Sequence, residues 1–478
     1  MWRFIIAVLC LLIEFSVSAR DLNRQNYLIG ERASGIGGAI VALDGDPEAS
    51  YYNPAGLATI MRQGISLSAS AYQAAFEKYG AIMDIPVGDG DRLTANMRSN
   101  AFSTFPQSLM YVLPVGSNDI DAATHHVLAL SLIIPDYDKV SGSITQPIEN
   151  YAFEMKGSFF WEEKTFWFGP SYAIAIGPRL RLGVSIFGLA HQFERRVNLG
   201  VKLTTATTLI NYYSTVSSED EGFGFTWLFQ VGAQFQLDDR WTIGLVVRSP
   251  TLGSIYSNMR MLRLASYYAE DQNGNPVASP QEPGYVDRIE TTNVSMDFRL
   301  PAMIAVGTSY QIPDLLAVGF DLTFHFPQGT YSLFSGPTIY PQDPQGQNII
   351  DESRALDPSE EHRARWIINV NTGAEVHLFT NWRLRAGFFT DFSVVDNAFY
   401  AQSKETRTAS IGNPNLVRLG SSLGVSRFSE HATTSVNLVY TCGWGNNWGL
   451  NESFGYDPNR VSVTAHTVTL VIAGTANF

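Results

Sequence analysis

Apolar and polar side chains alternate with a period of two residues along most of the second half of the chain. The clearest segment starts near Gly222. The apolar residues of one of its faces are Phe223, Phe225, Trp227, Phe229, Val231, Ala233 and Phe235. Successive side chains of an extended strand point to opposite faces, so this pattern predicts a strand with one apolar and one polar face.

The connectors between these segments are short and long in turn. The short connectors are 238–240, 312–315, 379–381 and 429–432. The long connectors are 253–292, 327–362, 394–413 and 445–459, and a further long loop is expected over 194–221. Transmembrane β-barrels alternate in this way, because their periplasmic turns are brief and their outer loops are extended.

We therefore predict an all-β fold, a transmembrane antiparallel barrel of about fourteen strands over residues 64–478, within the even-numbered range of bacterial outer-membrane barrels. One face of each strand meets lipid and the other faces the lumen. The expected strands are near 64–75, 102–113, 125–135, 156–176, 179–192, 222–237, 240–250, 294–310, 315–326, 363–378, 382–393, 415–428, 433–444 and 460–478.

Charged side chains fall on the polar faces of these strands, among them Arg248, Arg383 and Arg385. A charge that faces lipid near the bilayer midplane costs about 2–4 kcal/mol for Arg or Lys, so the apolar faces are predicted to meet lipid. The three arginines are then lumen residues. They either receive a carboxylate head group or pair with lumen acids such as Asp321 and Glu375, as intramembrane charges usually do.

The last segment alternates up to the terminal Phe478. An open strand edge cannot survive in lipid, so the last strand must pair with the first. A C-terminal strand that ends on Phe resembles the signal that bacterial barrel-assembly machinery recognises. Phe478 is therefore a predicted contact of that machinery.

Composition and the first residues limit the class of protein further. After the N-terminus no apolar run has the length of a transmembrane helix. The net charge of -13 argues against a nucleic-acid partner. Residues 1–19 have the features of a secretory signal peptide, with a cleavage site before Arg20. No catalytic constellation, metal site or cofactor is predicted, and we do not expect an enzyme.

Residues 20–63 do not alternate and are rich in small residues and turn formers. They predict a short helix over 36–43 and a sharp corner at Asn53-Pro54, because the residue before proline avoids the helical region. Such a segment cannot bury a core of its own. It needs a surrounding wall.

This segment resembles the hatch of the FadL/TodX family of outer-membrane transporters for hydrophobic compounds. The matching pieces are Gly-Gly-Ala-x-x-Ala at 37–42, Asp-x-x-Ala at 46–49 and Tyr-Asn-Pro-Ala-Gly-Leu-Ala at 52–58. The most specific element of the motif falls on Asn53, Pro54 and Ala55. Residues 244–250 and 299–307 also resemble strand pieces of the family. The resemblance spans essentially the whole mature chain and implies a hatch over 20–63, folded inside a fourteen-strand barrel.

The resemblance implies passive transport of hydrophobic molecules, such as long-chain fatty acids or aromatic hydrocarbons, across the bacterial outer membrane. Family members capture the ligand in an oily groove between long outer loops and release it sideways where an early strand kinks. The candidate capture residues here are Leu209, Ile210, Tyr212, Tyr213, Met259, Met261, Leu262, Leu264, Tyr267 and Tyr268. Such apolar clusters either bind ligand or pack on each other as a cap.

Pro135 ends the predicted third strand, and it marks either the wall opening or only a strand end. The expected partners are the hydrophobic ligand and outer-membrane lipid, and we expect a monomer. The alternative function is a protein-interaction platform in type IX-like secretion, as in some relatives with a similar hatch. An outer-membrane lipase is disfavoured because no nucleophile–base pair stands out.

A calcium-loop spacing occurs in one of the long connectors. Its residues are Asp271, Asn273, Asn275, Ser279 and Glu282. Pro276 occupies the position where glycine makes the bend of such a loop, so an Asn273-Gly274 turn explains the spacing more simply.

Overall fold

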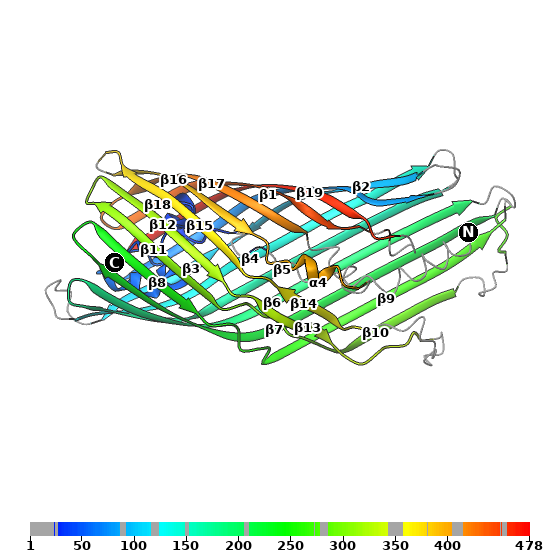
Figure 1. The fold of residues 1–478 in the computed structure, drawn as a ribbon, viewed down its shortest axis with the longest axis horizontal. Coiled ribbons are helices and arrows are strands. Elements are labelled where there is room, and N and C mark those ends of the chain that lie inside the picture. Colours follow the sequence, from blue (N-terminus) through cyan, green and yellow to red (C-terminus); the bar gives the residue numbers. More distant parts are fainter. Residues whose placement is uncertain are drawn as a thin grey trace.

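The computed structural model describes residue 23 and residues 27–86, 92–115, 124–148, 153–204, 210–271, 273–277, 285–342, 357–379, 381–403, 414–449, 451 and 457–478. In this part of the chain, 19 strands form one antiparallel sheet that closes on itself (Figure 1). The short N-terminal helices, drawn in blue, lie within one end of the barrel (Figure 1).

The strands of the first half are β1 (Gly64–Pro86), β2 (Arg92–Phe105), β3 (Ser108–Val115), β4 (Thr124–Ile148), β5 (Phe153–Ile176), β6 (Leu180–Thr204), β7 (Asn211–Gln236), β8 (Trp241–Arg248) and β9 (Tyr256–Glu270). Those of the second half are β10 (Tyr285–Met296), β11 (Met303–Ile312), β12 (Leu316–His325), β13 (Gln328–Ser335), β14 (Glu360–Ala364), β15 (Ile367–His377), β16 (Trp382–Phe392), β17 (Asn415–Phe428), β18 (Ala432–Trp448) and β19 (Arg460–Asn477). Five barrel strands are interrupted and consist of β2 with β3, β8 with β9, β10 with β11, β12 with β13, and β14 with β15. Counted in this way, the barrel has fourteen strands.

The last strand closes the barrel. β19 pairs antiparallel with β1, from Asn477 opposite Gly64 to Ser462 opposite Gly80. Its other edge pairs with β18. The predicted fold class and the pairing of the last strand with the first are confirmed. The four predicted short connectors also separate consecutive strands: β7 from β8, β11 from β12, β15 from β16, and β17 from β18.

Several strands are much longer than predicted. β4, β5, β6 and β7 contain 25, 24, 25 and 26 residues, whereas a tilted strand needs about 9–11 to cross a bilayer. The predicted loops over 194–221 and 253–292 are therefore wrong, because they contain the ends of β6 and β7 together with β9 and β10. Outside the bilayer both faces of a strand are free to be polar, so the alternation that marks a strand is lost there. β4 also continues through Pro135, so the predicted strand end at that residue is wrong.

The helices of the described residues are short. They are α2 (Glu31–Gly35), α3 (Ala49–Tyr52), the 3₁₀ helix η1 (Pro54–Thr59) and α4 (Asn397–Tyr400). The predicted helix over 36–43 is wrong. α2 ends at Gly35, and Gly37 and Gly38 follow with φ of 66° and 77°, a conformation that glycine adopts easily and that stops a helix. No helix in the described ranges is long and apolar enough to cross a membrane.

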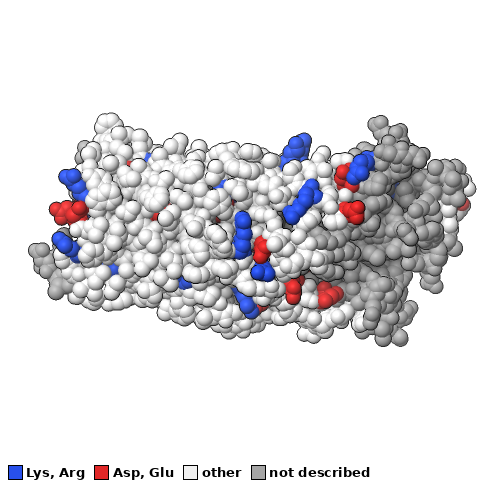
Figure 2. Space-filling view, viewed as in Figure 1, with Lys and Arg blue, Asp and Glu red and all other residues white. Residues whose placement is uncertain are grey.

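The outward face of the barrel carries the predicted apolar side chains. On β7, Phe229, Val231 and Phe235 are 40%, 58% and 42% exposed, whereas Gln230 and Gln234 on the lumen side are buried. In Figure 2, charged side chains gather across the middle of the visible face and again near its left-hand end, and the surface between them is almost uncharged. An apolar belt between two polar borders is typical of a barrel that spans a bilayer.

Candidate functional site

The N-terminal segment, residues 27–63, lies against the inner wall of the barrel and is mostly buried. The wall has glycine where the backbone of this segment comes closest. A Cβ atom added to Gly183 would lie 2.3 Å from the carbonyl carbon of Pro54, and one added to Gly387 would lie 2.1 Å from the amide nitrogen of Gly37. The same close approach recurs at further wall positions, and we call the whole set the wall glycines: Gly183, Gly232, Gly244, Gly319, Gly373 and Gly387. Any side chain at these positions would displace the segment.

The predicted Asn53-Pro54 corner is present and joins two turns of the segment. The Asn53 side-chain oxygen accepts a hydrogen bond from the amide of Ala55 at 3.1 Å and so caps η1. Its side-chain nitrogen donates to the carbonyl oxygens of Val41 at 2.7 Å and of Ala233 at 3.3 Å. Pro54 is the first residue of η1, where a missing N–H costs nothing. The corner therefore attaches the segment to β7.

Two of the three predicted lumen arginines are paired with acids. Arg385 donates to Glu31 at 2.7 Å and to Glu375 at 2.6 Å. Arg383 lies 3.9 Å from the same Glu375 carboxylate. This agrees with the pairing alternative rather than with a free head-group receptor. Because Glu31 begins α2, the cluster also holds the N-terminal segment to β15 and β16.

Arg248 has different surroundings. Its guanidinium donates to the side chain of Gln230 at 2.8 Å and to the backbone oxygen of Tyr51 at 3.1 Å. It also lies 5.0 Å from the ring centres of both Tyr51 and Trp167. Among the described residues no carboxylate forms an ion pair with Arg248. It is a cation beside two aromatic rings that also contact each other, with centroids 5.4 Å apart, a geometry that stabilises the charge inside an apolar lumen.

A large apolar cluster fills the lumen beside these rings. Its members come from the N-terminal segment, from β2 to β7, and from the connector between β10 and β11. We call it the lumen cluster: Tyr27, Ile29, Phe105, Met110, Ile133, Ile134, Trp167, Phe187, Leu189, Leu228, Phe298 and Leu300. Apolar and aromatic linings with a few polar groups are characteristic of small-molecule sites. This part of the lumen is therefore chemically suited to an apolar ligand.

The backbone ladder of the barrel wall is interrupted beside the lumen cluster, where the side chains of Phe105 and Tyr137 stack across the gap. β3 pairs with β4 as far as Ile133, and β2 takes up the pairing with β4 again at Gly142. Between these ladders no pair joins residues 100–106 to residues 135–140 in the described chain. We call these two stretches and the space between them the wall window.

Two prolines explain the wall window. The register of the ladders on its two sides is the same, and it places Pro106 opposite Pro135. Prolines within a sheet are confined to edges, strand starts and bulges, so regular pairing ends where these two meet, next to the hydrogen bond from the Ile134 amide to the Gln107 carbonyl oxygen. Pro135 also lies where the register between β4 and β5 shifts, between Ile133 and Asp136, and such a bulge bends the strand. The sequence pointed to Pro135. Its partner Pro106 was missed because the register was not known.

Tyr27 of the N-terminal segment covers the wall window from inside. Its hydroxyl group donates to the Gln73 side chain at 2.7 Å and also contacts the carbonyl oxygen of Tyr137. Its ring packs edge-on against Phe105, with centroids 4.8 Å apart, and Phe105 stacks on Tyr137 at 4.7 Å. One side chain of the lumen segment thus contacts β1, β2 and β4 together. Sequence reasoning gave no signal for Tyr27.

The predicted capture residues do not form one loop groove. Ile210 precedes β7, Tyr212 and Tyr213 lie in β7, and Leu209 falls outside the described residues. The others lie in β9: Met259, Met261, Leu262, Leu264, Tyr267 and Tyr268. Neighbouring side chains of a strand point to opposite sides, so Met259 and Met261 are buried on the lumen side while Leu262 and Leu264 face outward. The placement of Tyr212, Tyr213 and the six β9 residues on loops is wrong, because β7 and β9 extend through these positions.

The two methionines belong to a second apolar cluster, which joins β13 to the long strands β4 to β7 with β9 and β10, called here the tall wall. We call it the outer cluster: Phe193, Met259, Met261, Ile289, Val294, Met296, Leu333 and Phe334. The rings of Phe193 and Phe334 stack with centroids 5.4 Å apart. Methionine is flexible and adapts to ligands of different shape. The cluster lies beyond the lumen cluster along β6, on the side of the long connectors.

A buried ion cluster lies next to the outer cluster on the lumen side of β6, β7 and β9. Asp220 on β7 is paired with Arg195 on β6 and with Arg263 on β9, and the side chains of the three are 0%, 1% and 6% exposed. One terminal nitrogen of Arg263 lies 3.1 Å from the Asp220 carboxylate. The guanidinium of Arg195 lies 5.8 Å from the Trp161 ring centre. One carboxylate thus compensates two cations and braces three strands.

The calcium-loop spacing forms a simple turn. The Asp271 carboxylate accepts hydrogen bonds from the Asn275 side chain at 3.1 Å and from the amides of Asn275 at 2.9 Å and Asn273 at 2.8 Å. These bonds stabilise the charged form and lower the pKa of Asp271. Gly274 has a φ of 78°, as an Asn-Gly turn requires. Ser279 and Glu282 lie outside the described residues.

A closed antiparallel barrel with a lipid-facing belt defines a multi-pass β-barrel of the bacterial outer membrane. No family model and no curated protein matches the chain. Solved structures do match. A Pseudomonas aeruginosa FadL homologue has 14% identity and a TM-score of 0.57, with 95% of this chain and 100% of that chain covered.

Two toluene transporters are similar as well. TodX of Pseudomonas putida has 14% identity and a TM-score of 0.55 over 96% of this chain and 100% of its own. TbuX of Ralstonia pickettii has 15% identity and a TM-score of 0.50 over 95% of this chain and 99% of its own. The chain therefore has the fold of the FadL-type barrels, as the resemblance of its sequence predicted. These structural neighbours are transporters rather than enzymes.

Proposed function

We propose that this protein is a passive transporter for hydrophobic molecules, such as long-chain fatty acids or aromatic hydrocarbons, which it releases through the barrel wall. The observation that carries the proposal is the wall window, which lies directly beside the lumen cluster. A ligand that leaves sideways enters lipid and keeps its apolar surface from water, which stabilises it by about 25 cal/mol per Å². The structural neighbours TodX and TbuX, which are toluene transporters, support transport of a hydrophobic compound.

We propose further that residues 20–63 act as a hatch that stays in place. The wall glycines and the Arg385 ion pairs support this role, since they attach the segment to both sides of the lumen. Only its first residues, with Tyr27, need to move for the window to open. The signal peptide over 1–19, the contact of Phe478 with the assembly machinery and the monomeric state remain predictions.

Capture is proposed to occur at the outer cluster rather than along both faces of β9. Its apolar side chains line the lumen side of the tall wall and meet β13 there. From this cluster a ligand would pass along the inner wall to the lumen cluster. The alternative function as a secretion platform is not favoured, because the structural neighbours transport small hydrophobic molecules.

Closing the wall window should slow transport. The double substitution Pro106→Val with Pro135→Val replaces the two proline rings by side chains that fit a strand, so the ladder that ends at Gln107 and Ile134 can continue into the gap. The next hydrogen-bonded pair of the ladder adds two bonds of about 1 kcal/mol each, so the open window should become rarer by about thirtyfold. We expect a similar fall in the initial uptake of radiolabelled oleate and toluene by cells that lack their own transporter.

The matched control is Pro114→Val. Pro114 also lies in this interrupted strand, but its ladder with β4 is intact, opposite Val127. This variant should take up both probes at the rate of the unmodified protein. Unchanged uptake in the folded double variant would exclude the window as the exit.

Substitutions on the two sides of β9 test which of the predicted capture residues bind the ligand. Met259→Gln with Met261→Gln keeps the side-chain volumes but adds polar groups to the outer cluster, so oleate binding should weaken by about tenfold. Leu262→Gln with Leu264→Gln makes the same kind of change on the outward side of β9 and should leave affinity within about twofold. Binding is measured by titrating the purified barrel with oleate. If only the Leu262 and Leu264 variant loses affinity for oleate, the capture site lies on the outward side of β9.

A further inference from the structure

The outer face of β4 to β7 changes its chemistry in a fixed order along the strands. Near the short turns it is apolar, and Phe168, Ile186 and Phe229 are between 37% and 40% exposed. Beyond this belt the outward positions become charged. The cationic side chains of the charged band are Lys139, Lys164, Arg196, Arg260 and Arg288, with glutamates between them.

Beyond the charged band the outward positions carry small hydroxyl and amide side chains. Ser143, Ser158, Asn198 and Ser217 stand opposite one another on β4, β5, β6 and β7. They border a trough of about 680 Å³ on this wall. The hydroxyl group of Ser217 donates to the Asn198 side chain at 2.8 Å. Lys156, Leu199 and Leu264 also line the trough, so it offers hydroxyl and amide groups, one cation and apolar surface, to which a sugar can present both its hydroxyl groups and its C–H groups.

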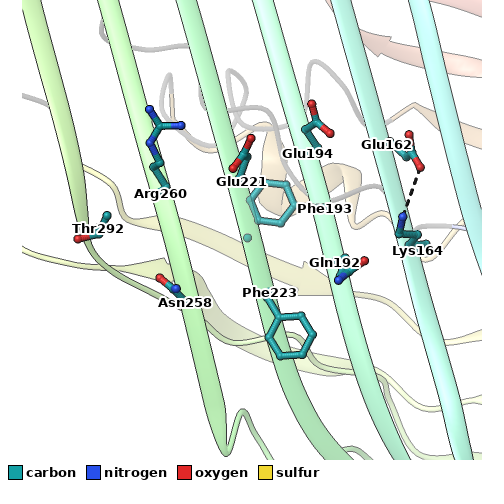
Figure 3. Close-up of a pocket in the computed structure, with 11 residues that line it drawn as sticks. Glu162, Lys164, Gln192, Phe193, Glu194, Glu221, Phe223, Asn258, Arg260 and Thr292 are labelled. Atoms are coloured by element: carbon teal, nitrogen blue, oxygen red, sulfur yellow. Dashed lines mark ion pairs between the residues drawn. The ribbon is translucent and has the colours of Figure 1, made fainter.

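The charged band contains a hollow. It has a volume of about 450 Å³ and lies across β5, β6, β7, β9 and the end of β10. In Figure 3, Lys164 and Glu162 form one side of it, Arg260 lies on the other side, and Glu194 and Glu221 lie between them. Lys164 is 33% exposed and 3.6 Å from Glu162. Arg196, next to the hollow, is 51% exposed and forms ion pairs with Glu194 and, at 3.0 Å, with Glu219, so a phosphate there would replace these exposed partners.

Lys139 is the cation whose environment points most clearly to an external anion. Its ammonium group lies 5.6 Å from the centre of the Phe160 ring, and Arg196 lies 5.9 Å from the same ring. No carboxylate among the described residues forms an ion pair with Lys139. Two cations therefore flank one outward aromatic ring directly above the lipid belt. A phosphate group at this height would meet both.

We propose that this wall binds a phosphorylated glycolipid of the outer leaflet. Along the strands, the apolar belt is followed by the charged band and then by the hydroxyl trough. In such a lipid, the acyl chains are followed in the same direction by the phosphates and then by the sugars. The glycolipid's acyl chains would pack on the apolar belt, its phosphates would contact Lys139, Lys164 and Arg196, and its sugars would fill the trough. The lipid would hold the tall wall upright at the membrane surface, a role separate from the passage of ligand inside the barrel.

The test measures lipid retained by the full mature protein in native mass spectra. The probe is lipid A with two phosphates and a short sugar core, and the comparison lipids are the same molecule after phosphatase treatment and phosphatidylglycerol. The unmodified barrel should retain the phosphorylated glycolipid at least about tenfold better than either comparison lipid, because only it offers phosphate and sugar together. The variant with Lys139→Gln, Lys164→Gln and Arg196→Gln should lose about tenfold in affinity, since three exposed ion pairs each contribute a modest factor.

The control variant carries Arg179→Gln and Arg240→Gln, which change two exposed cations in the short turns at the other end of the barrel. It should retain the glycolipid like the unmodified protein. Heat-modifiable gel mobility shows whether each variant is folded. Equal retention by the folded triple variant, or equal retention of phosphatidylglycerol, would overturn the proposal.

Discussion

Replacing Asp220 with leucine is expected to lower the free energy of unfolding of the barrel by several kcal/mol. The carboxylate compensates Arg195 and Arg263, and all three side chains are almost completely buried. Asp220→Leu removes the carboxylate that the two buried guanidinium groups share. Removal of one partner from a buried ion pair costs about 3–5 kcal/mol. Urea unfolding of the barrel in detergent micelles, followed by tryptophan fluorescence, should show a loss of this size.

A triple variant separates charge from packing. Asp220→Leu combined with Arg195→Met and Arg263→Met removes the cations together with the carboxylate. An apolar replacement of a whole buried ion cluster is often neutral or stabilising, so this variant should regain most of the lost stability. If Asp220→Leu unfolds at the same urea concentration as the unmodified protein, the ion cluster does not brace β6, β7 and β9.

The barrel within the bilayer was predictable from sequence, but its outer extension was not. Along β7, the run from Phe223 to Phe235 alternates strictly because one face meets lipid. From Ser214 to Glu221 both faces carry polar or small residues apart from Val216, although the ladder with β6 continues without a break. Backbone hydrogen bonds hold that part of the strand, and they leave no mark in the pattern of side chains.

The site was predictable only where one local motif carries it. The Asn53-Pro54 corner depends on neighbouring residues and was found. The wall window depends on Pro106 and Pro135, which are far apart in sequence and meet only through the register of two strands. The wall glycines are similar, since nothing in the sequence around Gly183 or Gly387 shows that both touch one lumen segment.

Substitution of Gly387 by valine is expected to detach the N-terminal segment. A Cβ atom at this position would lie 2.1 Å from the amide nitrogen of Gly37 and 2.2 Å from the carbonyl carbon of Ile36. Both are backbone atoms, which cannot relieve the clash by a change of rotamer. The amide of Gly37 is also fixed by the Ser422 hydroxyl at 2.9 Å, and its carbonyl oxygen by the Asn371 side chain at 2.7 Å. Overpacking a rigid contact costs about 1–3 kcal/mol, and these hydrogen bonds would be lost as well.

Because β-branched residues are favourable in strands, the ladder of β15 and β16 should still form in Gly387→Val. The barrel then stays folded while the lumen opens. Planar-bilayer recordings should show a steady ion conductance that the unmodified protein lacks. Amide hydrogen exchange over residues 31–58 should also accelerate, by about tenfold for each 1.4 kcal/mol lost from the free energy that holds the segment on the wall. Gly200→Val is the matched control, since the nearest atom to a Cβ there is 3.8 Å away. A closed Gly387→Val barrel with unchanged exchange would mean that the segment is held by its ion pairs and that the wall glycines are incidental.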